Sequence, residues 1–145
     1  MLEDGMTVDQ KAELLGVPET ASLQEWAEVC NRVAAESGWN DRWDYLSDSP
    51  TSPDSIDHIL SKIGLIMSEQ AEAIEAIRDD PDVLAMEFTL DGKPEGFAVE
   101  LIDGIIRTLH LLAMTGVTAT YNLDEILREK LVYNASRGYK HGRHA

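Results

Sequence analysis

The sequence predicts an all-α protein, and three observations support this prediction. Apolar residues recur at intervals of three and four, no run shows the sustained alternation of a strand, and proline and glycine fall between the periodic segments. The chain has 145 residues, of which 43% are hydrophobic, which is enough for one domain with its own core. We therefore expect four main helices in a single domain, residues 1–145.

The first main helix is delimited by its capping residues. Ser22 is the expected N-cap, Glu25 is the reciprocal partner of a capping box, and Gly38 ends the helix. The preceding segment, 1–21, is poorly defined by its pattern, and a short helix at 7–15 is the one element that it suggests.

The second helix follows a stretch rich in Ser, Asp and Pro, 39–53. This stretch is expected to be a loop, because these residues favour local turn hydrogen bonds over helix continuation. The helix is expected to begin at residue 54 or 55 and to stop at Asp80, before a proline. Its apolar stripe includes Ile63 and Ile74, and Leu65 lies on the acidic side, so the helix is expected to be buried on two faces, which a second helix layer from another subunit would explain.

The second half of the chain is expected to contain two more helices. The connection 81–96 is consistent with either a short strand pair or a single helical turn. The third helix is expected to have Pro94 in its first turn and to end before Gly116, and it is the most apolar segment. The fourth is expected to run from Asn122 to about Gly138.

Composition excludes several classes of function. The formal charge of −15 argues against binding to nucleic acid, which requires clustered Lys and Arg. The N-terminal residues lack the basic and apolar regions of a signal peptide, and no stretch approaches the roughly 18 unbroken apolar residues of a membrane helix. We therefore expect a cytoplasmic protein that contacts neither nucleic acid nor membrane.

Two helices carry paired acids, Glu69 with Glu72 and Glu100 with Asp103. The spacing of three places both acids of a pair on one helical face, so two antiparallel helices can bring four carboxylates together. Mg²⁺ would offset their repulsion, with Mn²⁺ as a possible substitute. The alternative is a solvated face, since both pairs lie opposite the apolar stripes, and the residues alone leave this open. Arg107 is expected to pair with Asp103 within its helix.

One edge of the fourth helix carries cationic and amide side chains. Lys130, Asn134 and Arg137 recur at spacings of four and three and precede a basic tail, 138–145. They are candidates to bind a triphosphate, and the alternative is a helix C-terminus whose cations complement its dipole. Trp39 is the candidate to stack on a nucleobase, although tryptophan is more often a packing residue.

Three segments in this order carry a family resemblance: KIGLIMSEQAEAIEAIR, GKPEGFAVELIDGIIRTLHLLA and EKLVYNASRGYKHG. Together they span about 59–142 and are similar to the MazG-like nucleotide pyrophosphohydrolases, members of the all-α NTP pyrophosphatase superfamily. The family pattern, ExxE followed by ExxD, falls on the four acids named above, which the resemblance implies are Mg²⁺ ligands. The resemblance also implies substrate-binding residues, which correspond to Lys130, Asn134 and Arg137.

The resemblance implies a four-helix MazG-like bundle that assembles as a homodimer or homotetramer. Its implied activity is hydrolysis of a nucleoside triphosphate to the monophosphate and pyrophosphate, for house-cleaning of the nucleotide pool. Many relatives have an acidic residue in place of His110, which is either an exposed polar residue here or a group that supports the metal site. The alternatives are a phosphoribosyl-ATP pyrophosphohydrolase, or a helical interaction or nucleotide-binding module without catalysis.

Overall fold

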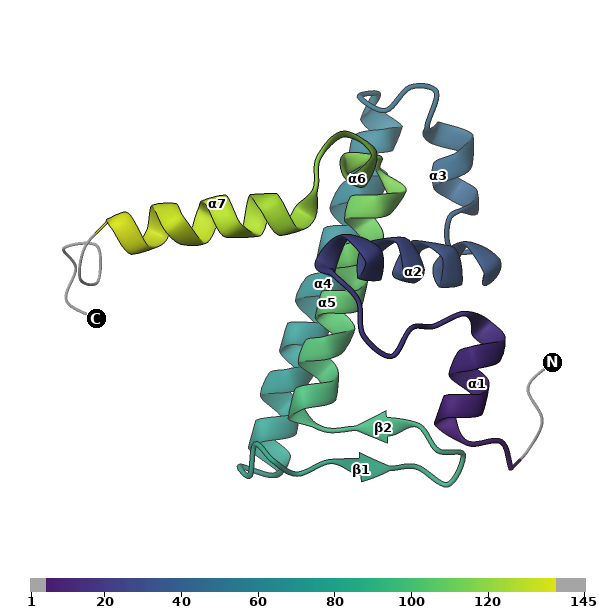
Figure 1. Ribbon diagram of the computed structural model, residues 1–145, viewed down its shortest axis with the longest axis vertical. Helices are drawn as coiled ribbons and strands as arrows, with labels where there is room; N and C mark the ends of the chain where they lie inside the picture. Colours follow the sequence, from purple (N-terminus) through teal and green to yellow (C-terminus); the bar gives the residue numbers. More distant parts are fainter. Residues whose placement is uncertain (1–4, 138–145) are drawn as a thin grey trace.

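The computed structural model describes residues 5–137, and this part of the chain is mostly helical (Figure 1). The helices are α1 (Val8–Leu15), α2 (Leu23–Glu36), α3 (Asp41–Leu46), α4 (Pro53–Asp79), α5 (Phe97–Met114), α6 (Val117–Thr120) and α7 (Leu123–Ser136). The predicted all-α class is confirmed, with one pair of two-residue strands added. None of the described helices is both long and apolar enough to cross a membrane.

The long helices α4 and α5 form an antiparallel pair, and α2 crosses α5 on one side (Figure 1). One buried cluster joins α2, α5 and the start of α7 and contains Ala27, Leu109, Ala113 and Leu123. A second cluster joins α3 to the end of α5. The core therefore lies along α5, which is consistent with its being the most apolar segment.

The capping residues behave as the sequence predicts. The Ser22 hydroxyl accepts from Glu25 N, and the Glu25 side chain accepts from Ser22 N, which completes the capping box of α2. A further carboxylate reaches the same helix end from α7, because Asp124 accepts hydrogen bonds from Leu23 N at 2.9 Å and Gln24 N at 3.0 Å. Helix N-termini attract such anions, so α7 holds α2 in place across α5.

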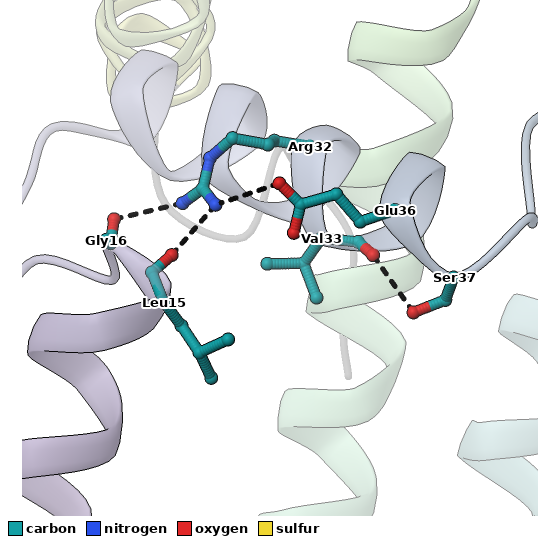
Figure 2. Close-up of polar contacts among 6 residues, drawn as sticks. All are labelled: Leu15, Gly16, Arg32, Val33, Glu36 and Ser37. Atoms are coloured by element: carbon teal, nitrogen blue, oxygen red, sulfur yellow. Dashed lines mark hydrogen bonds and ion pairs between the residues drawn. The ribbon is translucent and has the colours of Figure 1, made fainter. Parts of the chain in front are cut away.

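Arg32 ties the end of α1 to α2 (Figure 2). Its guanidinium donates to the carbonyl oxygens of Leu15 at 2.8 Å and Gly16 at 2.9 Å, and it lies 3.6 Å from the Glu36 carboxylate. The predicted short helix at 7–15 is confirmed as α1, with Thr7 as its N-cap. These contacts bring the segment after α1 against α2.

The prediction of a loop at 39–53 is wrong, because α3 lies inside it. Trp43 and Leu46 are both buried and pack against Met114 of α5. Burial of these two apolar side chains stabilises a short helix that the surrounding Ser, Asp and Pro residues disfavour. The next helix, α4, begins within two residues of the expected position, with Ser52 as its N-cap.

The connection between α4 and α5 is a strand pair, which decides between the two predicted alternatives. β1 (Glu87–Phe88) pairs antiparallel with β2 (Pro94–Glu95). The expectation that Pro94 lies in the first turn of α5 is therefore wrong, since α5 begins after Gly96. Gly96 has φ of 136°, and a Cβ there would lie 2.6 Å from the Ala85 carbonyl oxygen, so only glycine fits this junction.

Within residues 5–137 the apolar stripe of α4 is exposed, so burial of this helix on a second face is not seen in a single chain. Ile63 and Ile74 are 41% and 55% exposed, and Ile105 of α5 is 49% exposed. The two helices instead meet through faces that carry buried Glu69, Ala73 and Gly104. Within this chain the acidic faces turn inward, because small residues let the helices approach closely there.

Candidate metal centre and adjoining pocket

Three of the four predicted acids converge between α4 and α5. One carboxylate oxygen each from Glu69, Glu100 and Asp103 lies within 4.8 Å of the others. Glu69 is 6% exposed, whereas Glu100 and Asp103 are half-buried. A Cβ placed on Gly104 would lie 3.7 Å from the Glu69 Cβ, so the glycine permits this approach. The two motifs therefore form one cluster, as the spacing predicts.

The fourth acid, Glu72, adjoins this cluster through Glu100. Burial raises the pKa of Glu100, and a hydrogen bond with Glu72 and the charges of Glu72, Asp103 and Glu69 raise it further, to about 7. The pKa of Asp103 is raised as well, by burial and by the charge of Glu69. Repulsion among neighbouring carboxylates explains both shifts, and a bound cation would relieve it.

The donor set of this cluster fits a hard divalent cation. Every donor is a carboxylate oxygen, the ligand type that Mg²⁺ and Mn²⁺ prefer, and the cluster contains no His or Cys side chain. The excess of negative charge, which is evident in the raised pKa of Glu100, is what a divalent ion would neutralise. The residues present therefore fit Mg²⁺, which stays a prediction from the sequence.

Arg107 does not pair with Asp103 as expected. Its Nε donates to Glu69 Oε1 of α4 at 2.6 Å, so the ion pair bridges two helices. The buried Glu69 carboxylate is the stronger attractor, because it has lost most of its contact with water. The charge of Arg107 still lowers the pKa of Asp103, against the larger opposing effect of burial.

A cavity of about 500 Å³ opens beside the carboxylates. Its wall on α2 is apolar and includes Trp26, Val29 and Val33, while Glu69 and Asp103 lie at its other side. Trp39, the predicted base-stacking residue, lines this cavity and is 60% exposed. The structure thus places Trp39 next to the acidic cluster, and its stacking role stays a prediction.

The cavity is also lined by Lys62, for which the sequence predicts no role, and by His110. Lys62 precedes Glu69 by seven residues, two helical turns on the same face, a spacing that was visible in the sequence. His110 is buried, so the predicted alternative of an exposed polar residue is wrong. Its Nε2 lies 2.6 Å from Asn40 Oδ1, and the Asn40 amide donates to Asn31 Oδ1 at 2.7 Å.

The predicted substrate-binding residues of α7 are not brought to the carboxylates within one chain. Lys130 and Arg137 lie 5.0 Å and 5.6 Å from the centre of the Tyr133 ring, and Asn134 is half-buried. None of the three lines the cavity described above. Figure 1 shows α7 extending away from the α4–α5 pair. Their role stays a prediction, and the tail 138–145 lies outside the described residues.

The protein is therefore mostly helical, with a cluster of carboxylates between α4 and α5 and a cavity beside this cluster. Comparison with models of protein families, with curated proteins and with solved structures found no match. The resemblance to MazG-like proteins therefore rests on the motif residues alone.

Proposed function

We propose that this protein is a Mg²⁺-dependent pyrophosphohydrolase of MazG-like type, which converts a nucleoside triphosphate to the monophosphate and pyrophosphate. The observation that supports this most is the convergence of Glu69, Glu100 and Asp103, of which Glu69 and Asp103 line a cavity of about 500 Å³. Sites for small molecules have volumes of roughly 300–1,000 Å³. The cavity therefore suits a nucleotide whose phosphates lie near the acids. Removal of unwanted nucleotides in the cytoplasm is the proposed use.

The proposed chemistry needs a water molecule to attack the α-phosphorus while pyrophosphate leaves. Glu69, Glu100 and Asp103 would hold Mg²⁺, which when bound supplies an acidified water and offsets charge on the leaving group. We assign Glu72, which adjoins Glu100 and is the most exposed of the four acids, as the residue that accepts the proton of this water. The apolar wall on α2 would limit access of bulk water to the nucleoside end.

We further propose that two copies join through the exposed stripe of the α4–α5 pair, in a homodimer or a homotetramer of two such dimers. This stripe consists of Ile56, Leu60, Ile63, Met67 and Ile74 on α4 and Leu101, Ile102 and Ile105 on α5, each at least 39% exposed. Exposed apolar side chains that gather on two neighbouring helices are typical of an interaction site. Pairing of two α4–α5 hairpins would produce the four-helix bundle that the resemblance implies.

In the same assembly, we propose that α7 contacts a neighbouring copy. This helix also exposes apolar residues, among them Leu131 at 57% and Val132 at 64%. Because it extends away from its own α4–α5 pair (Figure 1), we propose that Lys130, Asn134 and Arg137 reach the phosphates bound by a neighbouring copy.

Release of pyrophosphate from a panel of ribo- and deoxyribonucleoside triphosphates and phosphoribosyl-ATP, with and without Mg²⁺, tests the activity. The proposal predicts Mg²⁺-dependent release that Glu72→Gln or Asp103→Asn abolishes. Asp57→Asn is the matched control, because Asp57 is an exposed acid on the same helix that does not line the cavities at the acidic cluster. Absence of release from every nucleotide would overturn the proposed activity.

A further inference from the structure

Lys62 is a half-buried lysine on α4 that lines the cavity beside the acidic cluster. Its ammonium lies 3.5 Å from the Trp39 carbonyl oxygen and 5.8 Å from the centre of the Trp39 ring. Across residues 5–137 the ion pairs are Arg32 with Glu36, Arg78 with Glu75, Lys93 with Glu95 and Arg107 with Glu69. Lys62 therefore has no carboxylate partner within this range, in a chain of net charge −15.

A second cation, Arg107, lines the same cavity as Lys62. Burial lowers the pKa of Lys62, and the positive charge of Arg107 on the opposite helix lowers it further. Arg107 is neutralised by Glu69, whereas among residues 5–137 the Lys62 ammonium has only a carbonyl oxygen and an aromatic face as partners. An ammonium has three donors, so this position favours an additional anion.

The cavity has two chemically different sides. Trp26, Val29 and Val33 of α2 form an apolar wall, and Lys62 and Arg107 lie with Glu69 and Asp103 on the α4–α5 side. A ligand that fits both sides of the cavity has a flat, weakly polar group for the apolar side and a multiply charged anion for the polar side. Nucleoside triphosphates have this form.

We infer that Lys62 is a substrate-binding residue, whose ammonium holds the phosphate chain of a nucleotide that has its base against the Trp26 and Val33 wall. This inference rests on the proposed function and adds a residue from the same chain to the phosphate contacts proposed for α7. A point charge on a flexible stem is the usual form of a phosphate-binding lysine.

A purely structural role for Lys62 would be to anchor the turn at Trp39. Loss of such an anchor would weaken binding of a nucleoside monophosphate and of a triphosphate to the same extent. A phosphate-binding role predicts a loss that grows with the number of phosphates. The dependence on phosphate number therefore separates the two roles.

Calorimetric titration provides the test, using α,β-imido nucleoside triphosphates of the four common bases and the corresponding monophosphates, in Mg²⁺. For the nucleotide that binds best, Lys62→Met is expected to weaken triphosphate binding about tenfold or more and monophosphate binding less than about threefold. Lys62→Arg should retain most of the affinity. Lys11→Met, on α1 and away from the cavity, is the control for loss of one positive charge.

An equal loss for monophosphate and triphosphate, no loss at all, or no binding by the wild-type protein would overturn the inference. Melting temperatures of all variants exclude misfolding as the cause. The proposed hydrolase activity fails separately, if the triphosphate binds in a Lys62-dependent way but no pyrophosphate is released from ordinary nucleotides. Conversely, normal hydrolysis with an unchanged KM in Lys62→Met would contradict the role of Lys62 alone.

Discussion

Arg107 Nε donates to the Glu69 carboxylate at 2.6 Å, and this ion pair joins α5 to α4 inside the acidic cluster. The Glu69 side chain is 8% exposed and that of Arg107 is 40% exposed. The guanidinium therefore neutralises the most buried acid of the cluster in the protein without a cation. A divalent ion bound to Glu69 would compete with Arg107 for the same carboxylate.

Replacement of Arg107 by Met should destabilise the cation-free protein by about 1–2 kcal/mol, because Glu69 stays buried without its partner. The loss should shrink when saturating Mg²⁺ neutralises Glu69 instead. Urea unfolding in chelator and in Mg²⁺ measures both values. Arg78→Met, which removes an exposed pair with Glu75, is the control and should change stability by less than about 0.5 kcal/mol. If Arg107→Met lowers the free energy of unfolding equally in chelator and in Mg²⁺, no cation binds to Glu69.

The raised pKa of Glu100 predicts how stability changes with pH. Its ordinary value is 4.5 and its value in the folded, cation-free protein is about 7, so the folded state binds this proton more tightly than the unfolded state. The resulting stabilisation is present at low pH and is lost as pH rises from 4.5 through about 7.

We therefore expect the urea concentration at the unfolding midpoint, measured in chelator, to decrease as the pH rises from about 5 to about 8. Glu100→Gln should remove most of this decrease. Mg²⁺ should oppose the decrease in the wild-type protein, because it favours the ionised carboxylates. Parallel pH profiles for the wild-type protein and Glu100→Gln would contradict the repulsion described for this cluster.

Gly96 joins β2 to α5 in a conformation that other residues rarely adopt. Gly96→Ala should cost about 1–3 kcal/mol, because its Cβ would meet the Ala85 carbonyl oxygen and the backbone would be strained. Gly64→Ala is the control, since it lies within α4 with open space around it and should stabilise the helix by about 0.5–1 kcal/mol. Thermal unfolding compares the two variants, and equal effects would show that the junction is not constrained.

The fold was predictable where signals are local. The capping box of Ser22 and Glu25, the N-cap at Asn122 and the spacing of the paired acids all depend on residues within a few positions of each other. Failures occurred where distant contacts decide the structure. Burial against Met114 creates α3, and the Glu69 carboxylate draws Arg107 across to the other helix.

The exposed stripe shows why periodicity alone does not identify which helical face packs into the core of the chain. A helix with apolar residues on more than one face gives no local sign of which face meets its own chain. The stripe that contains Ile63 is exposed in this chain, whereas the acidic face is buried. The cavity residue Lys62 was overlooked because its position matters only once α2 and α5 are in place.

The proposed assembly through the exposed stripe predicts a specific sensitivity to charge. Met67→Glu should shift the wild-type oligomer to a monomer in sedimentation velocity, because it would bury a charge at the interface. Leu14→Glu is matched in exposure, at 64% against 63% for Met67, but lies on α1 outside the stripe and should leave the oligomer unchanged. A monomeric wild-type protein, or equal effects of the two changes, would contradict the proposed interface.

Titration with Mn²⁺, followed by the loss of free-ion signal in electron paramagnetic resonance, tests most directly whether the acids of α4 and α5 bind one cation site together. The wild-type protein should bind Mn²⁺, and both Glu69→Gln and Asp103→Asn should weaken binding about tenfold or more, because each removes a ligand from a different helix. Asp57→Asn, which removes an exposed acid of α4 away from the cluster, should bind like the wild-type protein. No binding by the wild-type protein, or normal binding by the Glu69 and Asp103 variants, would contradict the account.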